Sequence, residues 1–202
     1  FLSLFDNTMN VHPSPLPKYR GCAPTFAAIK NMDGKTAVTL QEIGLGIDEG
    51  RIYSSLPIDL SGDETTLSLE ERVSQMVPQF VLETLKNIDT IDRVQQEGEA
   101  SYTAFITKED GRIDWKREAK EIHALVRACI PWPRAYGYLG EDKLLITGVY
   151  GTAFDSFPPS TEEPGTVVGL EKGKGLKIAT GNGYLYVTRV LPPMKKEMDA
   201  AS

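Results

Sequence analysis

The spacing of apolar positions in the first ninety residues switches between the patterns of strands and of helices. Residues 37–43 alternate in polarity and are rich in β-branched side chains, and residues 52–60 resume this pattern, so two strands are predicted. Pro24 suits the first turn of one helix. Ser68-Leu-Glu-Glu matches a capping box that begins another, because apolar residues follow at helical spacing. This alternation favours an α/β domain.

The pattern changes at about residue 92. Residues 92–111 are mostly polar, which predicts an extended tether, and Asp114 is placed to cap a helix that Pro131 ends. Short strands are then predicted at 143–150, 166–171, 176–180 and 184–191, with an Asn182-Gly183 hairpin before the last. One helix and four or five strands predict a small, partly open, OB-like barrel. We therefore expect a first domain at 1–91, a linker at 92–111 and a barrel domain at 112–202.

The composition is that of an ordinary globular protein. Hydrophobic residues make up 41% of the 202 positions and charged residues 25%, and no apolar run approaches the roughly 20 residues that cross a membrane. The two cysteines, Cys22 and Cys129, predict a reduced, cytoplasmic setting. Two histidines leave little material for a zinc site, and we expect no metal.

The first residues give two further expectations. The opening Phe-Leu-Ser-Leu-Phe has no basic flank and no cleavage site, so we expect no signal peptide. The chain begins without methionine and reaches a polar motif by residue 10, so we expect it to be a piece of a longer protein.

The net charge of −6 is unevenly distributed. Residues 112–202 hold 13 Lys or Arg against 11 Asp or Glu, whereas the first 111 residues hold 9 against 17. An acidic first part repels nucleic acid and the second part tolerates it. Two ordinary solvated surfaces explain the same numbers equally well.

Candidate chemistry begins at Asn10 and His12, which share one face of an extended segment because strand residues alternate. Three prolines in the loop after His12 restrict its shape. Ser14 permits a Ser-His-Asp hydrolase interpretation, but no Gly-x-Ser-x-Gly elbow surrounds it. Lys18 and Arg20 can steer a phosphate, or they can be solvated loop residues.

A second loop, residues 44–50, contains three glycines in seven residues and two acidic residues, Asp48 and Glu49. Such a density of glycine allows a sharp bend or the close approach of a ligand to the backbone. An ordinary turn between two strands is the alternative.

These two motifs together resemble the signature of the 10-formyltetrahydrofolate-dependent formyltransferases. That signature combines Asn-x-His, a proline-containing loop that ends in Arg-Gly, and Gly-Leu-Asp-x-Gly; here Asn10 to Gly21 and Gly46-Ile-Asp-Glu-Gly50 match it. Pro15 and Gly44 depart from its commoner residues. Gly111-Arg-Ile-Asp-Trp115 and Pro131-Trp-Pro133 resemble the carboxyl-terminal domain of the methionyl-tRNA formyltransferases.

The resemblance implies the catalytic group Asn10, His12 and Asp48. It also implies that the backbone of one loop lines the folate pocket and that another loop contacts substrate. The first set is Ile43, Gly44, Leu45, Gly46 and Ile47, and the second set is Ser14, Leu16, Pro17 and Arg20.

The chemistry of formyl transfer fits these residue types. Attack of an amine on a formamide carbon builds negative charge on the formyl oxygen, and the Asn10 amide can donate to it. A histidine can take the proton of the attacking nitrogen and return one to the leaving nitrogen. Asp48 can hold the imidazole in one tautomer, which we favour, or relay a proton through water.

The resemblance further implies the C-terminal part of a Rossmann-like formyltransferase domain, a 10-formyltetrahydrofolate cosubstrate and initiator methionyl-tRNA as partner. We expect a monomer that acts in translation initiation, with no membrane association. Most of the first half of the family's catalytic domain precedes Asn10, so we expect these 202 residues alone to bind folate poorly. Lys172, Lys174, Lys177, Arg189, Lys195 and Lys196 would suit a tRNA backbone if they share one face. The alternatives are a sugar-amine formyltransferase, a 10-formyltetrahydrofolate hydrolase and, from another class, a non-catalytic RNA-binding module.

Overall fold

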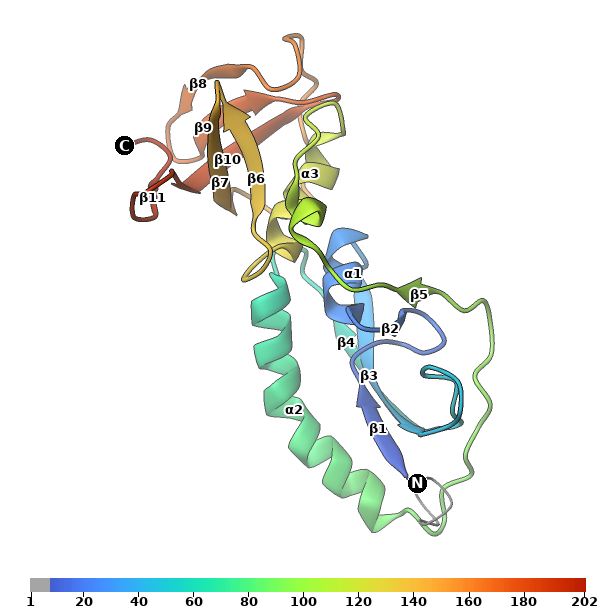
Figure 1. Ribbon diagram of the computed structural model, residues 1–202. Helices are drawn as coiled ribbons and strands as arrows, with labels where there is room; N and C mark the ends of the chain where they lie inside the picture. Colours follow the sequence, from blue (N-terminus) through green and yellow to red (C-terminus); the bar gives the residue numbers. More distant parts are fainter. Residues whose placement is uncertain (1–7) are drawn as a thin grey trace. The chain divides into compact units, whose positions relative to one another are not determined.

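The computed structural model describes residues 8–202 and consists of two compact units (Figure 1). The first unit contains the residues up to 28, residues 33–60 and residues 68–105; the second contains residues 29–32, 61–67 and 106–202. The opening segment, for which no signal peptide was expected, lies outside the described residues. In the part of the chain that is described, no helix has the length and apolar character needed to cross a membrane.

The first unit is organised around a three-stranded antiparallel sheet with the order β1-β3-β4. Its strands are β1 (Met9–His12), β3 (Lys35–Glu42) and β4 (Ile52–Asp59). The central strand β3 is buried along most of its length, which agrees with its β-branched and apolar sequence. Both strands predicted from alternation are therefore confirmed, and the α/β content is confirmed by the two helices beside them.

The helices α1 (Pro24–Lys30) and α2 (Thr66–Lys86) follow β2 and β4 in the chain. Pro24 begins α1 as predicted. The prediction that α2 begins at the Ser68 capping box is wrong, because the helix begins two residues earlier. Within the second unit, the Thr66 hydroxyl donates to the Ala128 carbonyl at 2.7 Å and the Leu67 N–H to the Ile130 carbonyl at 3.0 Å, so contacts distant in sequence satisfy this helix end.

The polar segment after α2 is bound to the first unit along its length. Val94 forms an isolated bridge with Ile52, with N–H···O distances of 2.8 and 3.0 Å. Further along, β5 (Tyr102–Thr103) pairs in parallel with β2 (Arg20–Gly21), as Figure 1 shows. We call residues 93–103 the strap, since they run across the unit with regular backbone contacts.

The second unit contains a sheet with the order β6-β7-β10-β9-β8, and β11 pairs with β10. Neighbouring strands are antiparallel. Its elements are the 3-10 turn η2 (Lys108–Gly111), α3 (Ala119–Ala128), β6 (Ala135–Leu139), β7 (Asp142–Val149), β8 (Val167–Glu171), β9 (Gly175–Ala179), β10 (Tyr184–Leu191) and β11 (Met198–Asp199).

The predicted barrel is an open sheet in residues 8–202, because the edge strands β6 and β8 do not pair with each other. The four predicted strands are confirmed, and so is the Asn182-Gly183 hairpin, where Gly183 has a φ of +100°. The prediction that Asp114 caps α3 is wrong. Asp114 accepts the Lys116 N–H in a turn at 3.0 Å, and α3 begins only at Ala119.

Candidate functional site

Strand β1 presents two of the predicted catalytic residues. Asn10 lies opposite Gln41 of β3, and His12 lies opposite Thr39. The period of two places both side chains on one face, while the intervening Val11 is exposed on the other. The imidazole is only 4% exposed, so its two nitrogens depend on protein groups for hydrogen bonds.

The backbone of the proline-containing loop determines the tautomer of His12. The ring Nε2 lies 2.8 Å from the carbonyl oxygen of Tyr19. A carbonyl can only accept, so Nε2 carries a proton and donates it. Tyr19 adopts a left-handed backbone conformation, with a φ of +62°, which turns its carbonyl towards the ring. Neutral His12 therefore has its lone pair at Nδ1, 3.5 Å from the Asp48 Oδ2 atom.

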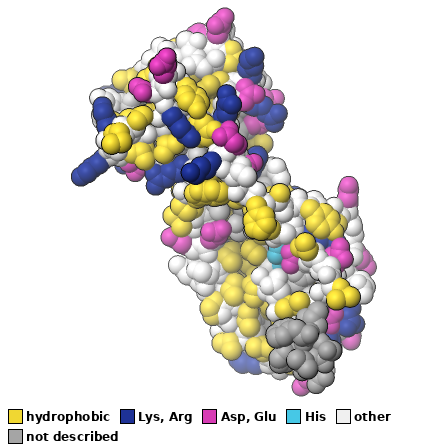
Figure 2. All heavy atoms as spheres, viewed as in Figure 1, with side chains coloured by type: hydrophobic (Ala, Val, Ile, Leu, Met, Phe, Trp, Pro, Cys, Tyr) yellow, Lys and Arg dark blue, Asp and Glu magenta, His cyan; other side chains and the backbone are white. Residues whose placement is uncertain are grey.

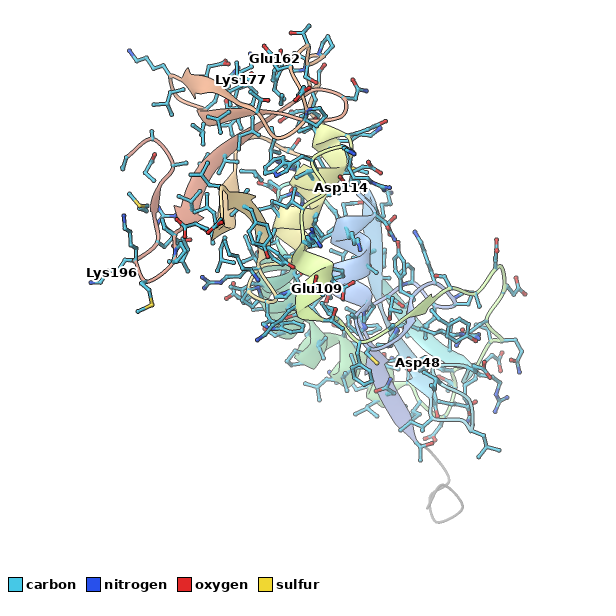
Figure 3. The ribbon with its side chains drawn as sticks, turned by 45° about the horizontal axis from the view of Figure 1, so that its top comes forward. Asp48, Glu109, Asp114, Glu162, Lys177 and Lys196 are labelled. Atoms are coloured by element: carbon cyan, nitrogen blue, oxygen red, sulfur yellow. The ribbon has the colours of Figure 1, made fainter. Side chains whose placement is uncertain are left out.

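The carboxylate of Asp48, a residue labelled in Figure 3, accepts hydrogen bonds from three segments of the first unit. Its Oδ1 accepts from Gln41 Nε2 at 2.6 Å and from Asn10 Nδ2 at 3.3 Å. Its Oδ2 accepts the backbone N–H of Gly21 at 2.8 Å. The structure thus brings the amide of Asn10 and the imidazole of His12 to the same carboxylate, that of Asp48, at 3.3 and 3.5 Å.

Two residues of this arrangement were absent from the sequence-based set. Gln41, only 1% exposed, is a carboxamide in a strand that is buried along most of its length, so it needs hydrogen-bond partners within the protein. Gln96 of the strap donates through Nε2 to the carbonyl oxygens of Asp48 and Gly50, both at 2.8 Å. Its segment looked like a polar tether, and no local pattern pointed from it to the site.

The predicted folate loop, residues 43–47, is exposed at every position. Leu45 is fully exposed and Ile47 about two thirds exposed, an unusual state for aliphatic side chains. At the base of the loop an ion pair joins Glu42 to Arg51 at 2.8 Å. Arg51, assisted by Arg93, holds the pKa of the Glu42 carboxyl below its ordinary value despite partial burial.

Gly50 closes this base. A Cβ atom at Gly50 would lie 1.8 Å from the carbonyl oxygen of Glu42, so only glycine fits without movement of the backbone. Gly21 has a similar role beside Asp48, where its φ is +103° and a Cβ would lie 2.4 Å from the Thr103 carbonyl. Both glycines therefore serve close backbone approach near the predicted catalytic carboxylate.

The predicted substrate loop is largely turned inward. Ser14 and Leu16 are buried and Pro17 is half-buried, and the Ser14 hydroxyl donates to the Lys18 carbonyl at 2.6 Å. This hydroxyl is thus engaged with the loop's own backbone. Lys18 forms an ion pair with Asp33 at 2.9 Å, which outweighs its burial and raises the pKa of the ammonium.

Arg20, the fourth residue of the predicted substrate-binding set, is hydrogen-bonded to several side chains. Its guanidinium donates to Gln96 Oε1 from Nε at 3.1 Å and from Nη2 at 2.7 Å. It also donates from Nη1 to Glu49 at 3.2 Å and to the Tyr102 hydroxyl at 2.9 Å. Arg20 therefore links the loop to the strap and to the Asp48 segment.

The basic side chains of the second unit, which would suit a tRNA backbone if they shared one face, do not gather in a single cluster. Figure 2 shows Lys and Arg side chains over its visible face, interspersed with acidic ones. Lys177 lies over the Tyr184 ring at 3.9 Å, and in Figure 3 it is well separated from Lys196. Lys174 pairs with Glu171 at 2.6 Å. Within residues 8–202 there is no group of three or more His, Cys, Asp or Glu side chains that could hold a metal ion.

Comparisons with known proteins agree with this geometry. Residues 1–85 match the family model described as "Formyl transferase", and residues 105–202 match "Formyl transferase, C-terminal domain". Methionyl-tRNA formyltransferase of Marinobacter nauticus is 35% identical over 191 residues, which are 93% of this chain and 60% of that protein. The chain therefore spans less than two thirds of that relative's length.

Two solved structures share the fold. HypX from Aquifex aeolicus, in complex with tetrahydrofolic acid, has a TM-score of 0.68 and 22% identity, over 96% of this chain and 34% of that one. The N-formyltransferase from Helicobacter canadensis, in complex with folinic acid and dTDP-3-aminofucose, also has a TM-score of 0.68 and 22% identity, over 89% of this chain and 64% of that one. With two matched models that leave only residues 86–104 uncovered, the chain belongs to the formyl transferase family.

Proposed function

We propose that the protein transfers a formyl group from 10-formyltetrahydrofolate to the amino group of initiator methionyl-tRNA, the reaction that prepares the first aminoacyl-tRNA for translation. The observation that carries the proposal is the convergence of Asn10, His12 and Asp48 in a member of the formyl transferase family. The methionyl-tRNA acceptor is supported by the 35% identical relative from Marinobacter nauticus.

In this mechanism Asn10 stabilises the developing oxyanion. One N–H of its amide is directed to Asp48 Oδ1 at 3.3 Å, and the amide carries a second. As the acceptor amine attacks the formyl carbon, the carbonyl electron pair moves onto oxygen, and a preorganised neutral donor lowers the energy of that charge. The bond from the same carbon to the folate nitrogen then breaks and the carbonyl re-forms.

His12 moves the proton through Nδ1. Its Nε2–H is committed to the Tyr19 carbonyl, so the lone pair at Nδ1 accepts the proton that the attacking amine loses. The resulting imidazolium faces Asp48 Oδ2 at 3.5 Å, and the carboxylate stabilises its positive charge. The same proton passes to the leaving folate nitrogen. Asp48 thus acts on the charged form of the imidazole, whereas the Tyr19 carbonyl sets the tautomer.

The residues of the exposed loop fit the proposed donor. A folate carries a flat, largely apolar ring system, and the side chains of Leu45 and Ile47 offer uncovered aliphatic surface beside the Asp48 segment. The backbone of Ile43, Gly44 and Gly46 lies in the same exposed stretch, where a ring can approach it closely.

A sugar amine is the second candidate acceptor, and the structural likeness to the Helicobacter canadensis enzyme favours its inclusion. The experiment supplies the full-length protein with 10-formyltetrahydrofolate and, in parallel, methionyl-tRNA, a nucleotide-linked amino sugar, or water alone. We expect a formylated product with methionyl-tRNA and its loss by several orders of magnitude in His12→Ala. Product only with the amino sugar, or only formate, would assign the protein to the other acceptors; RNA binding by the parent protein without formylation of any acceptor, unchanged in His12→Ala, would indicate a non-catalytic module.

A further inference from the structure

The strap brings one polar side chain, Gln96, to the back of the candidate catalytic site. Its neighbours fix its position: Val94 is hydrogen-bonded to Ile52 in both directions, and Arg93 forms an ion pair with Glu42. The side chain of Gln96 is partly buried, while the adjacent Gln95 is exposed. Gln96 is therefore presented by an ordered backbone.

The carboxamide of Gln96 has its hydrogen-bonding capacity filled. Its Nε2 group donates to the carbonyl oxygens of Asp48 and Gly50 at 2.8 Å each, with Gln41 Oε1 more distant at 3.4 Å. Its Oε1 atom accepts two N–H groups of Arg20, at 3.1 and 2.7 Å. Two donors and two acceptor sites are thus matched to two carbonyls and one guanidinium.

This pattern requires an amide in one orientation. Rotation of the amide by 180° would direct its NH₂ group at the guanidinium and its oxygen at two carbonyl oxygens, so the network fixes the assignment. A glutamate has the same shape, but it would place a carboxylate oxygen against the carbonyls of Asp48 and Gly50. Gln96→Glu consequently retains the contact with Arg20 and removes the two donors.

Gln96 contacts both segments that meet at the Asp48 carboxylate, namely the Asp48–Gly50 segment and the Arg20–Gly21 segment. On one side, the amide holds the backbone of Asp48, which has a left-handed φ of +54°, and of Gly50. On the other side, it holds Arg20, the residue before Gly21, whose N–H donates to Asp48 Oδ2 at 2.8 Å. Movement of either segment would change where the carboxylate points.

We propose that Gln96 is a positioning residue for formyl transfer: it fixes the Asp48 loop against the Arg20–Gly21 segment so that the carboxylate faces Nδ1 of His12. This inference rests on the proposed function and adds a residue outside the proposed catalytic group of Asn10, His12 and Asp48. Gln96 acts through Asp48, so its effect belongs to the chemical step and not to the affinity for the formyl donor.

The test compares Gln96→Glu with Gln95→Glu, which introduces the same charge one residue away on an exposed side chain. Steady-state kinetics of the full-length protein, with 10-formyltetrahydrofolate as the varied substrate, separate kcat from KM. We expect Gln96→Glu to lower kcat by about 10- to 100-fold, as displacement of a catalytic group by about 1 Å does, with KM within about 2-fold. Gln95→Glu is expected to leave both unchanged.

Thermal unfolding of each variant shows whether the enzyme is folded at the assay temperature. An unchanged kcat per folded molecule in Gln96→Glu would overturn the positioning role, as would a fall confined to folate affinity. If Gln96→Glu does not fold, Gln96→Met, which keeps the length without charge, carries the same expectation. His12→Ala tests the proposed function separately from the role of Gln96: retained formyl transfer in that variant would refute the proposed function itself.

Discussion

Protonation of His123 should destabilise the second unit in mild acid. The ring lies on α3, is fully buried, and accepts the Arg127 Nε–H at Nδ1 over 3.2 Å. Its Nε2 donates to the carbonyl of Gly151 at 3.2 Å, so the neutral tautomer fills both nitrogens. A second ring proton would be directed at a guanidinium. Burial first, and then the positive charge of Arg127, lower the pKa of His123 from 6.5 to about 4.

The size of the stability loss follows from the difference between the pKa of His123 in the folded and in the unfolded chain. A histidine with a folded pKa of about 4 and an unfolded pKa of 6.5 is neutral in both states above pH 7, where the fold keeps its full stability. Between these values the unfolded chain binds the extra proton, so stability falls as the pH falls. The total loss over about 2.5 pH units is ~3 kcal/mol, of which about 2 kcal/mol accumulates between pH 7 and pH 5. That is a large part of the 5–15 kcal/mol that holds an ordinary domain folded.

Urea unfolding followed by tryptophan fluorescence measures this directly. Both tryptophans of the chain, Trp115 and Trp132, lie in the second unit, so the signal reports that unit. The parent protein and His123→Gln are each unfolded at pH 7 and at pH 5, a range in which ordinary carboxyl groups remain largely ionised. A glutamine can still accept from Arg127 and donate to Gly151, but it does not titrate.

We expect the parent to lose about 2 kcal/mol of unfolding free energy between the two pH values and His123→Gln to lose much less. His123→Gln will also carry a constant loss from imperfect packing, which cancels when the two pH values are compared. Equal pH dependence in the two proteins would refute the reasoning, since it would mean that the buried imidazole does not control acid stability.

Four further measurements test the site and its surroundings. Asn10→Ala should lower kcat by about 10²–10³ with little change in the KM for the formyl donor; a change confined to KM would make Asn10 a binding residue. Asp48→Asn should lower kcat by roughly 10²-fold, less than the ~10⁴-fold that loss of tautomer control produces in a serine-protease triad, because a backbone carbonyl sets the tautomer here. At pH 8 a thiol reagent should modify the exposed Cys22, whereas Cys129, whose pKa burial raises to about 12, should react only after unfolding; mass spectrometry of the native protein distinguishes one adduct from two. Gly50→Ala should reduce stability by about 1–3 kcal/mol in thermal unfolding, because its Cβ would meet a backbone oxygen at 1.8 Å.

The sequence predicted elements whose causes are local. Alternation identified β3 and β4, and Asn182-Gly183 identified a hairpin because a left-handed glycine is a local requirement. The predicted start of α2 at the Ser68 capping box was wrong. The Thr66 hydroxyl donates to the carbonyl of Ala128, 62 residues away, and the helix begins at Thr66. Such tertiary partners leave no trace in the neighbouring residues.

The candidate site likewise combines residues that a sequence motif indicates with residues whose partners are distant in sequence. Asn10, His12 and Asp48 were predicted from the resemblance to the formyltransferase signature, and the structure brings them together. Gln96 was missed because its partners lie 46 to 76 residues away, and a polar residue in a polar stretch resembles a solvated linker. The expected partly open barrel is not shown either, because strand number alone does not determine whether β6 and β8 meet.

The exposed loop is packed at its base and exposed at its tip. At the base, Gly50 lies close to the backbone of Glu42, and the side chain of Glu42 forms an ion pair with Arg51. At the tip, Gly44 and Leu45 are exposed and do not contribute to the packed core of the first unit. Substitutions at the tip should therefore be nearly neutral for folding. Under the proposed function, a library randomised at those two positions is expected to alter the preference among folate derivatives while the Asp48 carboxylate stays in place, which makes this loop a practical starting point for engineering donor selectivity.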